Sequence, residues 1–125
     1  MPTVVKDITV KDVKRRIVYS FMYLSDDSVE FGVKKYSYGM ASSKTAYYWL
    51  GDSKLRYSFE HCDEEGITRE VMRCEIPLDG QKQSELLEEA KSIVKLSDEQ
   101  RDVDRRVKNL AYRLEDTLVN YVLVW

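Results

Sequence analysis

The sequence of 125 residues contains few cysteines, glycines and prolines, and each scarcity excludes a class of protein. Five glycines and two prolines are too few for a collagen or a low-complexity chain. Two cysteines do not form the disulfide framework of small secreted domains. Cys62 and Cys74 fall on neighbouring predicted strands, but a turn near Gly66 does not set them opposite each other, so we expect free thiols. A chain of this length folds as a single domain without such crosslinks.

The chain also lacks a long hydrophobic run. The longest, Leu118 to Trp125, is interrupted by Asn120 and is much shorter than the roughly 20 residues of a membrane helix. Met1 to Asp7 contains no apolar run after a basic start, which indicates no secretory signal, and Pro2 stands where N-myristoylation requires glycine. These features predict a cytoplasmic protein with no membrane partner.

Neither sign of charge dominates, because 20 basic residues against 22 acidic residues give a net charge of −2. This excludes a basic coat for nucleic acid and a polybasic membrane adaptor. The charges are nevertheless unevenly distributed. Residues 34–57, the basic band, carry five basic side chains against Asp52 alone, whereas residues 60–90, the acidic segment, carry ten acidic side chains against three basic ones. We expect the acidic segment to face away from the basic band.

Alternation of apolar and polar residues predicts strands in the first 78 residues. Ser25 to Ser28 is a turn, because Ser and Asp side chains bond their own backbone, and it joins two strands into a hairpin. Tyr38 to Thr45 is a predicted loop. The predicted strands are residues 3–10 as an edge strand, 16–24, 29–37, 46–50, 54–61 and 69–78.

The pattern becomes helical after Pro77 and the Asp79-Gly80 pair. Leu86, Ala90 and Ile93 recur at the spacing of an amphipathic helix. A capping box over residues 97–100 opens a second helix, which we expect to end near residue 121, with a terminal strand over residues 117–125 as the alternative. The predicted fold is α+β: an antiparallel β-meander of five or six strands (residues 1–78) followed by two C-terminal helices packed on one face (residues 79–125).

Residues that carry catalysis or bind metals are scarce. The single histidine, His61, limits nucleophilic triads to one geometry, and no Gly-x-Ser-x-Gly motif is present. His61 and Cys62 are neighbours on a strand, so they point to opposite faces and do not chelate one ion. Before Lys44-Thr45, Tyr38 and Ser43 occupy the glycine positions of a phosphate-binding loop. We therefore predict no catalytic residue, metal or cofactor.

The basic band also contains six aromatic side chains. Tyr and Trp rimmed by cations form hot spots of protein interfaces, and the same combination stacks bases and neutralises phosphates in single-stranded nucleic acid. The nearby acidic segment would repel phosphate, which favours a protein partner. Alternation also places Tyr47 and Trp49 opposite to Tyr48, so part of the set is a candidate for the core. The predicted partner-binding residues are Lys34, Lys35, Tyr36, Tyr38, Lys44, Tyr47, Tyr48 and Trp49.

The apolar stripe of the second helix has two interpretations. It packs on the sheet, or it pairs with a second copy of the chain, since a terminal Trp after Val-Leu-Val is an apolar patch of the kind found at interfaces. The predicted contacts of a homodimer are Leu114, Leu118, Tyr121 and Trp125.

These features predict a small non-enzymatic binding or regulatory protein that acts by occupying the surface of a protein partner, as a viral or mobile-element inhibitor does. The first alternative is a single-stranded nucleic-acid-binding protein that uses the same residues. The second is a small enzyme of unknown reaction centred on His61.

Overall fold

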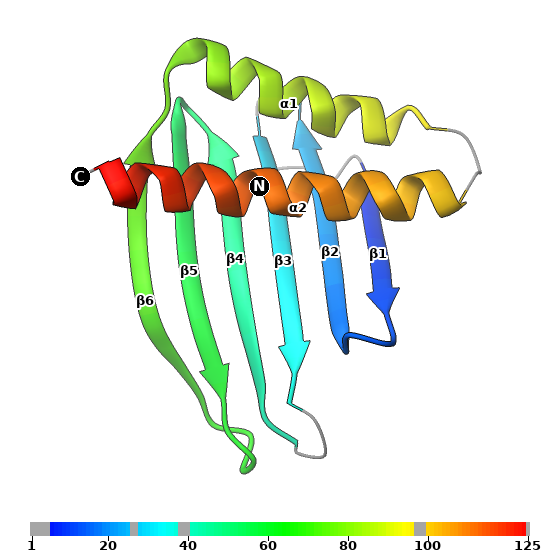
Figure 1. Ribbon diagram of the computed structural model, residues 1–125, viewed down its shortest axis with the longest axis vertical. Helices are drawn as coiled ribbons and strands as arrows, with labels where there is room; N and C mark the ends of the chain where they lie inside the picture. The colour runs from blue at the N-terminus through cyan, green and yellow to red at the C-terminus, as the bar shows by residue number, and fades with distance from the viewer. Residues whose placement is uncertain (1–5, 26–27, 38–40, 97–99, 125) are drawn as a thin grey trace.

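The computed structural model describes residues 6–25, 28–37, 41–96 and 100–124. Six antiparallel strands form one sheet in the order of the sequence, and two helices follow and lie on one face of it (Figure 1). The α+β meander that the sequence predicts is therefore confirmed. The elements are β1 (Lys6–Asp12), β2 (Ile17–Ser25), β3 (Ser28–Tyr36), β4 (Ser43–Gly51), β5 (Lys54–Cys62), β6 (Thr68–Pro77), α1 (Gly80–Val94) and α2 (Gln100–Val124).

Local chemistry accounts for two of the element boundaries. The side chain of Asp79 accepts a hydrogen bond of 2.7 Å from the Lys82 amide and caps the start of α1. Asp63 Oδ1 accepts the amides of Glu65 and Ile67, both at 3.0 Å, and Gly66 has a φ of 86°, which closes the β5–β6 turn. The predicted capping box lies mostly outside the described residues.

Of the predicted boundaries within the described residues, most differ from the structure by one or two residues, and two differ by three. β4 begins at Ser43 rather than at residue 46, because the polar Ser43-Lys44-Thr45 segment continues the pairing with β3 and β5. α2 continues to Val124, so the alternative of a terminal strand is wrong. The helix continues here because Leu118 and Tyr121 extend the stripe that packs on the sheet.

The hydrophobic core lies between the sheet and the helices. One face of the sheet, the helix-side face, contributes rings such as Phe21 and Phe31, which meet edge to face at a centroid distance of 6.0 Å. Leu86 of α1 and Leu110 of α2 are fully buried against this face. The other face, which we call the open face, carries no helix.

The stripe of α2 belongs to this core. Leu114 and Leu118 are only 1% and 8% exposed, and Tyr121 is half-buried against the same cluster. These observations support the first interpretation of the stripe, and they leave Leu114 and Leu118 unavailable for contact with a second copy. Trp125 lies outside the described residues. The homodimer itself stays a prediction.

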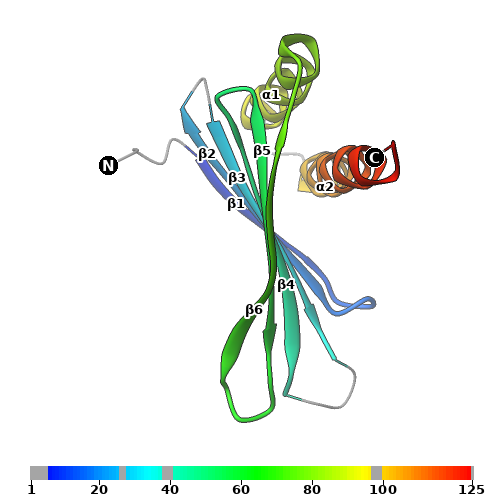
Figure 2. The ribbon, with the colours of Figure 1, turned by 90° about the vertical axis from the view of Figure 1, so that its left-hand side faces the viewer.

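The two helices cover only part of the helix-side face. Figure 2 shows the strands continuing beyond α2 toward the β3–β4 and β5–β6 turns, with no helix on either side. No helix of the described residues therefore covers either face of the sheet at this end.

Cys62 and Cys74 are free, as predicted. The register pairs Cys62 with Thr68 and Cys74 with Tyr57, so the thiols point to opposite faces of the sheet. Within the part of the chain that the structure describes, neither helix combines the length and the apolar character needed to cross a membrane.

Candidate binding face

Strand register arranges the open face in rows of side chains. Residues directly paired in neighbouring antiparallel strands share a face, so each row runs across the sheet from strand to strand. The first row is Met22, Glu30, Trp49, Arg56 and Glu75; the second is Ser20, Gly32, Tyr47, Ser58 and Arg73; the third is Val18, Lys34, Thr45, Glu60 and Glu70.

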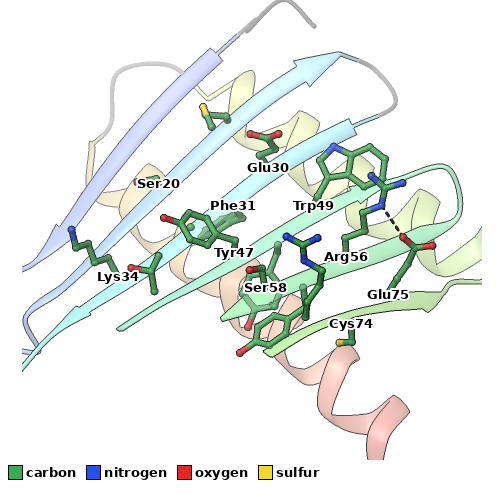
Figure 3. Close-up of a pocket in the computed structure, with 16 residues that line it drawn as sticks. Ser20, Glu30, Phe31, Lys34, Tyr47, Trp49, Arg56, Ser58, Cys74 and Glu75 are labelled. Carbon is green, nitrogen blue, oxygen red and sulfur yellow. Dashed lines mark hydrogen bonds and ion pairs between the residues drawn. The ribbon is translucent and has the colours of Figure 1, made fainter. Parts of the chain in front are cut away.

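The first row contains a fixed aromatic and charged group. The guanidinium of Arg56 lies over the Trp49 ring, 4.6 Å from its centroid, and Arg56 Nε donates a hydrogen bond of 2.9 Å to Glu75 Oε2 (Figure 3). Lys54 Nζ lies 3.3 Å from the other oxygen of Glu75. The carboxylate holds the guanidinium in place, and the guanidinium in turn orients the Trp49 ring, which favours an ordered binding surface.

Glu75 makes the stability of this group dependent on pH. Hydrogen bonds from Arg56 and then Lys54 lower the pKa of Glu75 below its ordinary value of 4.5. Because the pKa is lower in the folded state, the group stabilises the fold above pH 4.5, and this contribution is lost as the pH falls through the folded pKa. In Glu75→Gln, the melting temperature is therefore expected to fall less as the pH decreases than it does in the unmodified protein. Circular dichroism between about pH 6 and about pH 3 measures this.

Glu64→Gln is the matched control, since Glu64 is exposed in the β5–β6 turn. The melting temperature of Glu64→Gln should fall with decreasing pH as that of the unmodified protein does. Parallel curves for Glu75→Gln and the unmodified protein would contradict the stabilising role of the Glu75 pairs.

The small residues of the second row form the floor of a trough, and Tyr47 of the same row rises between them. Ser20, Gly32 and Ser58 are small, whereas larger side chains stand in the rows on both sides, and the resulting hollow has a volume of about 760 Å³. The Tyr47 ring leans over Gly32, where a Cβ atom would lie 3.8 Å from it. Tyr47 is nevertheless 46% exposed, so its ring forms a wall that a bound molecule can contact.

The structure separates the predicted partner-binding residues. Lys34, Tyr36, Tyr47 and Trp49 lie on the open face, and Lys34 Nζ is 5.1 Å from the Tyr36 centroid. Tyr48 points into the core and is 6% exposed, so it is unavailable to a partner. The remaining lysines, Lys35 and Lys44, lie on the helix-side face, and Tyr38 lies outside the described residues.

The expected separation of the basic band from the acidic segment is wrong. Antiparallel pairing of β5 with β6 brings Glu75 onto Arg56 and Lys54. Within the acidic segment, Arg73 is also paired, at 2.9 Å from Glu70. The net charge summed over a stretch of sequence therefore does not account for ion pairs between strands, which depend on the register.

Sequence reasoning also missed several residues of this face. Arg56 and Glu75 were assigned to strands but not to the site, and Ser58 and Gly32 carried no signal as single residues. The small side chains form a trough only because three strands align them in one row. One signal was available in the sequence. If the predicted strands 46–50 and 54–61 are aligned as a hairpin about the turn between them, Trp49 pairs with Arg56.

The described residues contain no group of three or more His, Cys, Asp or Glu side chains placed to hold a metal ion. His61 stands near the end of β5, half-buried, between Lys44 of β4 and Arg69 of β6. Comparisons of the chain with family models, curated proteins and solved structures gave no match.

Proposed function

We propose that this protein binds another protein through its open face and acts by occupying that partner's surface. The observation that carries the proposal is the trough between Tyr47 and the Trp49–Arg56–Glu75 group. The trough is large enough for several apolar side chains of a partner and has aromatic walls, and Trp, Tyr and Arg are the residues on which interface binding energy concentrates.

The charges of the open face favour a protein over a nucleic acid. Arg56, Lys54 and Arg73 are each within 3.3 Å of a carboxylate, so three of the basic side chains here are already neutralised. Nucleic acid requires cations that can replace the counterions of phosphate, and nearby carboxylates oppose this. A rim of paired charges instead gives a protein interface its register and specificity.

The same surface suits the regulatory role expected from the sequence, including that of an inhibitor encoded by a virus or mobile element. Such a protein needs one preformed face and no catalytic group. A cytoplasmic location remains a proposal, with the two free thiols in its favour.

Photo-crosslinking tests the proposal directly. A benzophenone amino acid in place of Tyr47 is expected to yield a discrete protein adduct in lysate, because position 47 stands in the wall of the trough. The matched control carries the same amino acid in place of Tyr112, which is 57% exposed but lies on α2. Adding Trp49→Ala to the protein with the probe at position 47 should reduce the yield of the adduct at least tenfold. This corresponds to a loss of about 1.4 kcal/mol of binding energy.

Nuclease treatment and salt distinguish the alternative. An adduct with a protein should survive nuclease treatment, and its yield should change little with salt concentration. An adduct lost on nuclease treatment, or affinity for oligonucleotides that falls with a log–log slope of about 0.7 per neutralised phosphate, would favour the nucleic-acid function. Equal adducts at positions 47 and 112 would place the binding surface elsewhere.

A further inference from the structure

A second row of basic side chains crosses the opposite face of the sheet. Lys35 of β3 pairs in register with Lys44 of β4, Lys44 with His61 of β5, and His61 with Arg69 of β6. These four residues, the basic row, have the register of the helix-side face and lie at the strand ends next to the β3–β4 and β5–β6 turns. The helices leave this end of the sheet bare (Figure 2). The four residues belong to four consecutive strands, so neighbouring members are about 5 Å apart at the backbone.

The basic row is unfavourable in the free protein. Like charges directly opposite each other in a sheet destabilise the pairing. Within the described part of the chain, Lys35, Lys44 and Arg69 have no hydrogen bond or ion pair that offsets this repulsion. The contrast with the open face is clear, because there the basic side chains Arg56, Lys54 and Arg73 all reach carboxylates. An anion held by the basic row would remove the repulsion.

An apolar cleft adjoins the row. It has a volume of about 400 Å³ and lies between the sheet and α2, with Val33, Ala46 and Phe59 on the sheet side and Val119 on α2. Lys35 and Lys44 also line it, and each lies two residues along its strand from a small or apolar lining residue, Val33 and Ala46 respectively. The cleft is within the size range of small-molecule sites.

Other charged groups around the cleft restrict where an anion can sit. Glu115 of α2 lines the cleft and would repel a negative charge placed near it. Arg15 and Lys108 also line it, but both face Asp12, at 3.9 Å and 3.2 Å respectively. The favourable arrangement therefore puts one anionic group between Lys35 and Lys44 and an uncharged body inside the cleft.

We infer that the helix-side face binds a small amphipathic anion, with a carboxylate on Lys35 and Lys44 and an apolar chain against Val33, Ala46 and Phe59. This site is separate from the open face, so its existence does not depend on the proposed protein partner. It also gives a role to Lys35 and Lys44, which lie away from the trough.

Octanoate is the probe, titrated into the labelled protein and followed by amide chemical shifts. Shifts are expected at Val33, Ala46 and Val119, and Lys35→Gln or Lys44→Gln should weaken the affinity roughly tenfold through loss of one charge-assisted contact. Lys34→Gln is the matched control, because Lys34 is adjacent in sequence but lies on the open face, and it should leave the affinity unchanged. Octylammonium lacks the negative charge and acetate lacks the long apolar chain, so both should bind at least tenfold more weakly than octanoate.

The stability of the free protein provides an independent measurement. Lys44→Gln removes the like-charge repulsion between Lys44 and Lys35, so the melting temperature without ligand should rise by roughly 1–3 °C. A lower melting temperature, equal binding of octylammonium or acetate, or equal loss of affinity in Lys34→Gln would overturn the inference. So would an absence of shifts with octanoate, or shifts at these amides produced by an oligothymidine and not by octanoate.

Discussion

Tyr48→Ala is expected to destabilise the protein by about 3–4 kcal/mol, whereas Tyr47→Ala, one residue away, should cost about 1 kcal/mol or less. Tyr48 is 6% exposed and packs against Tyr57 at a centroid distance of 5.2 Å, so its removal leaves a cavity in the core. Burial also raises the pKa of Tyr48, which keeps its hydroxyl protonated throughout the neutral range. Urea unfolding followed by circular dichroism measures both free energies.

Tyr48→Phe is the control, since it keeps the ring and removes only the hydroxyl. It should cost about 1 kcal/mol or less. The comparison between positions 47 and 48 also tests the register of β4, because a slip of one residue exchanges the two faces of a strand. A larger loss of stability at Tyr47 than at Tyr48 would show that β4 presents the opposite face to the helices.

Leu114→Asp is expected to cost roughly 4 kcal/mol or more, enough to unfold a domain of ordinary stability. Leu114 is 1% exposed at the centre of the α2 stripe, and the sheet offers no partner of opposite charge there among the buried residues of the core. Val119→Asp places the same side chain on the same helix at a position that is 43% exposed, and it should cost about 1 kcal/mol or less. Thermal and urea unfolding of both variants provide the comparison.

The oligomeric state of these variants distinguishes a core role from an interface role. If Leu114→Asp remained folded and only converted a dimer to a monomer, α2 would pair with a second copy rather than with the sheet. Light scattering during size-exclusion chromatography detects that outcome. Val119→Asp should leave the molar mass unchanged in either case.

The edge of the sheet at β6 bears on how the predicted homodimer would form. β6 is exposed along most of its length, with Val71 and Met72 at 63% and 55% exposure. A bulge interrupts its pairing with β5 opposite Phe59 and Glu60, and charged side chains flank the bulge. Bulges and charges are the devices by which proteins prevent pairing of edge strands. Continuation of the sheet into a second copy through β6 is therefore disfavoured.

Local periodicity was sufficient to predict the elements and the faces of their side chains. In a strand, successive side chains alternate, so the separation of Tyr48 from Tyr47 and Trp49 follows from their order alone. In the same way, the four-residue spacing of Leu110, Leu114 and Leu118 determines one stripe of α2. Both patterns depend on backbone geometry within a few residues, which is the information that a single sequence carries.

The candidate sites depended on pairing between distant residues. Register brings Glu75 onto Arg56, sets small residues of three strands in one row, and places Lys35 opposite Lys44. The packing of α1 and α2 then decides which face of the sheet is buried and where the basic row meets an apolar cleft. Charges and cavities arise from side chains that are close in space, and proximity across strands is a property of the folded chain rather than of its local pattern.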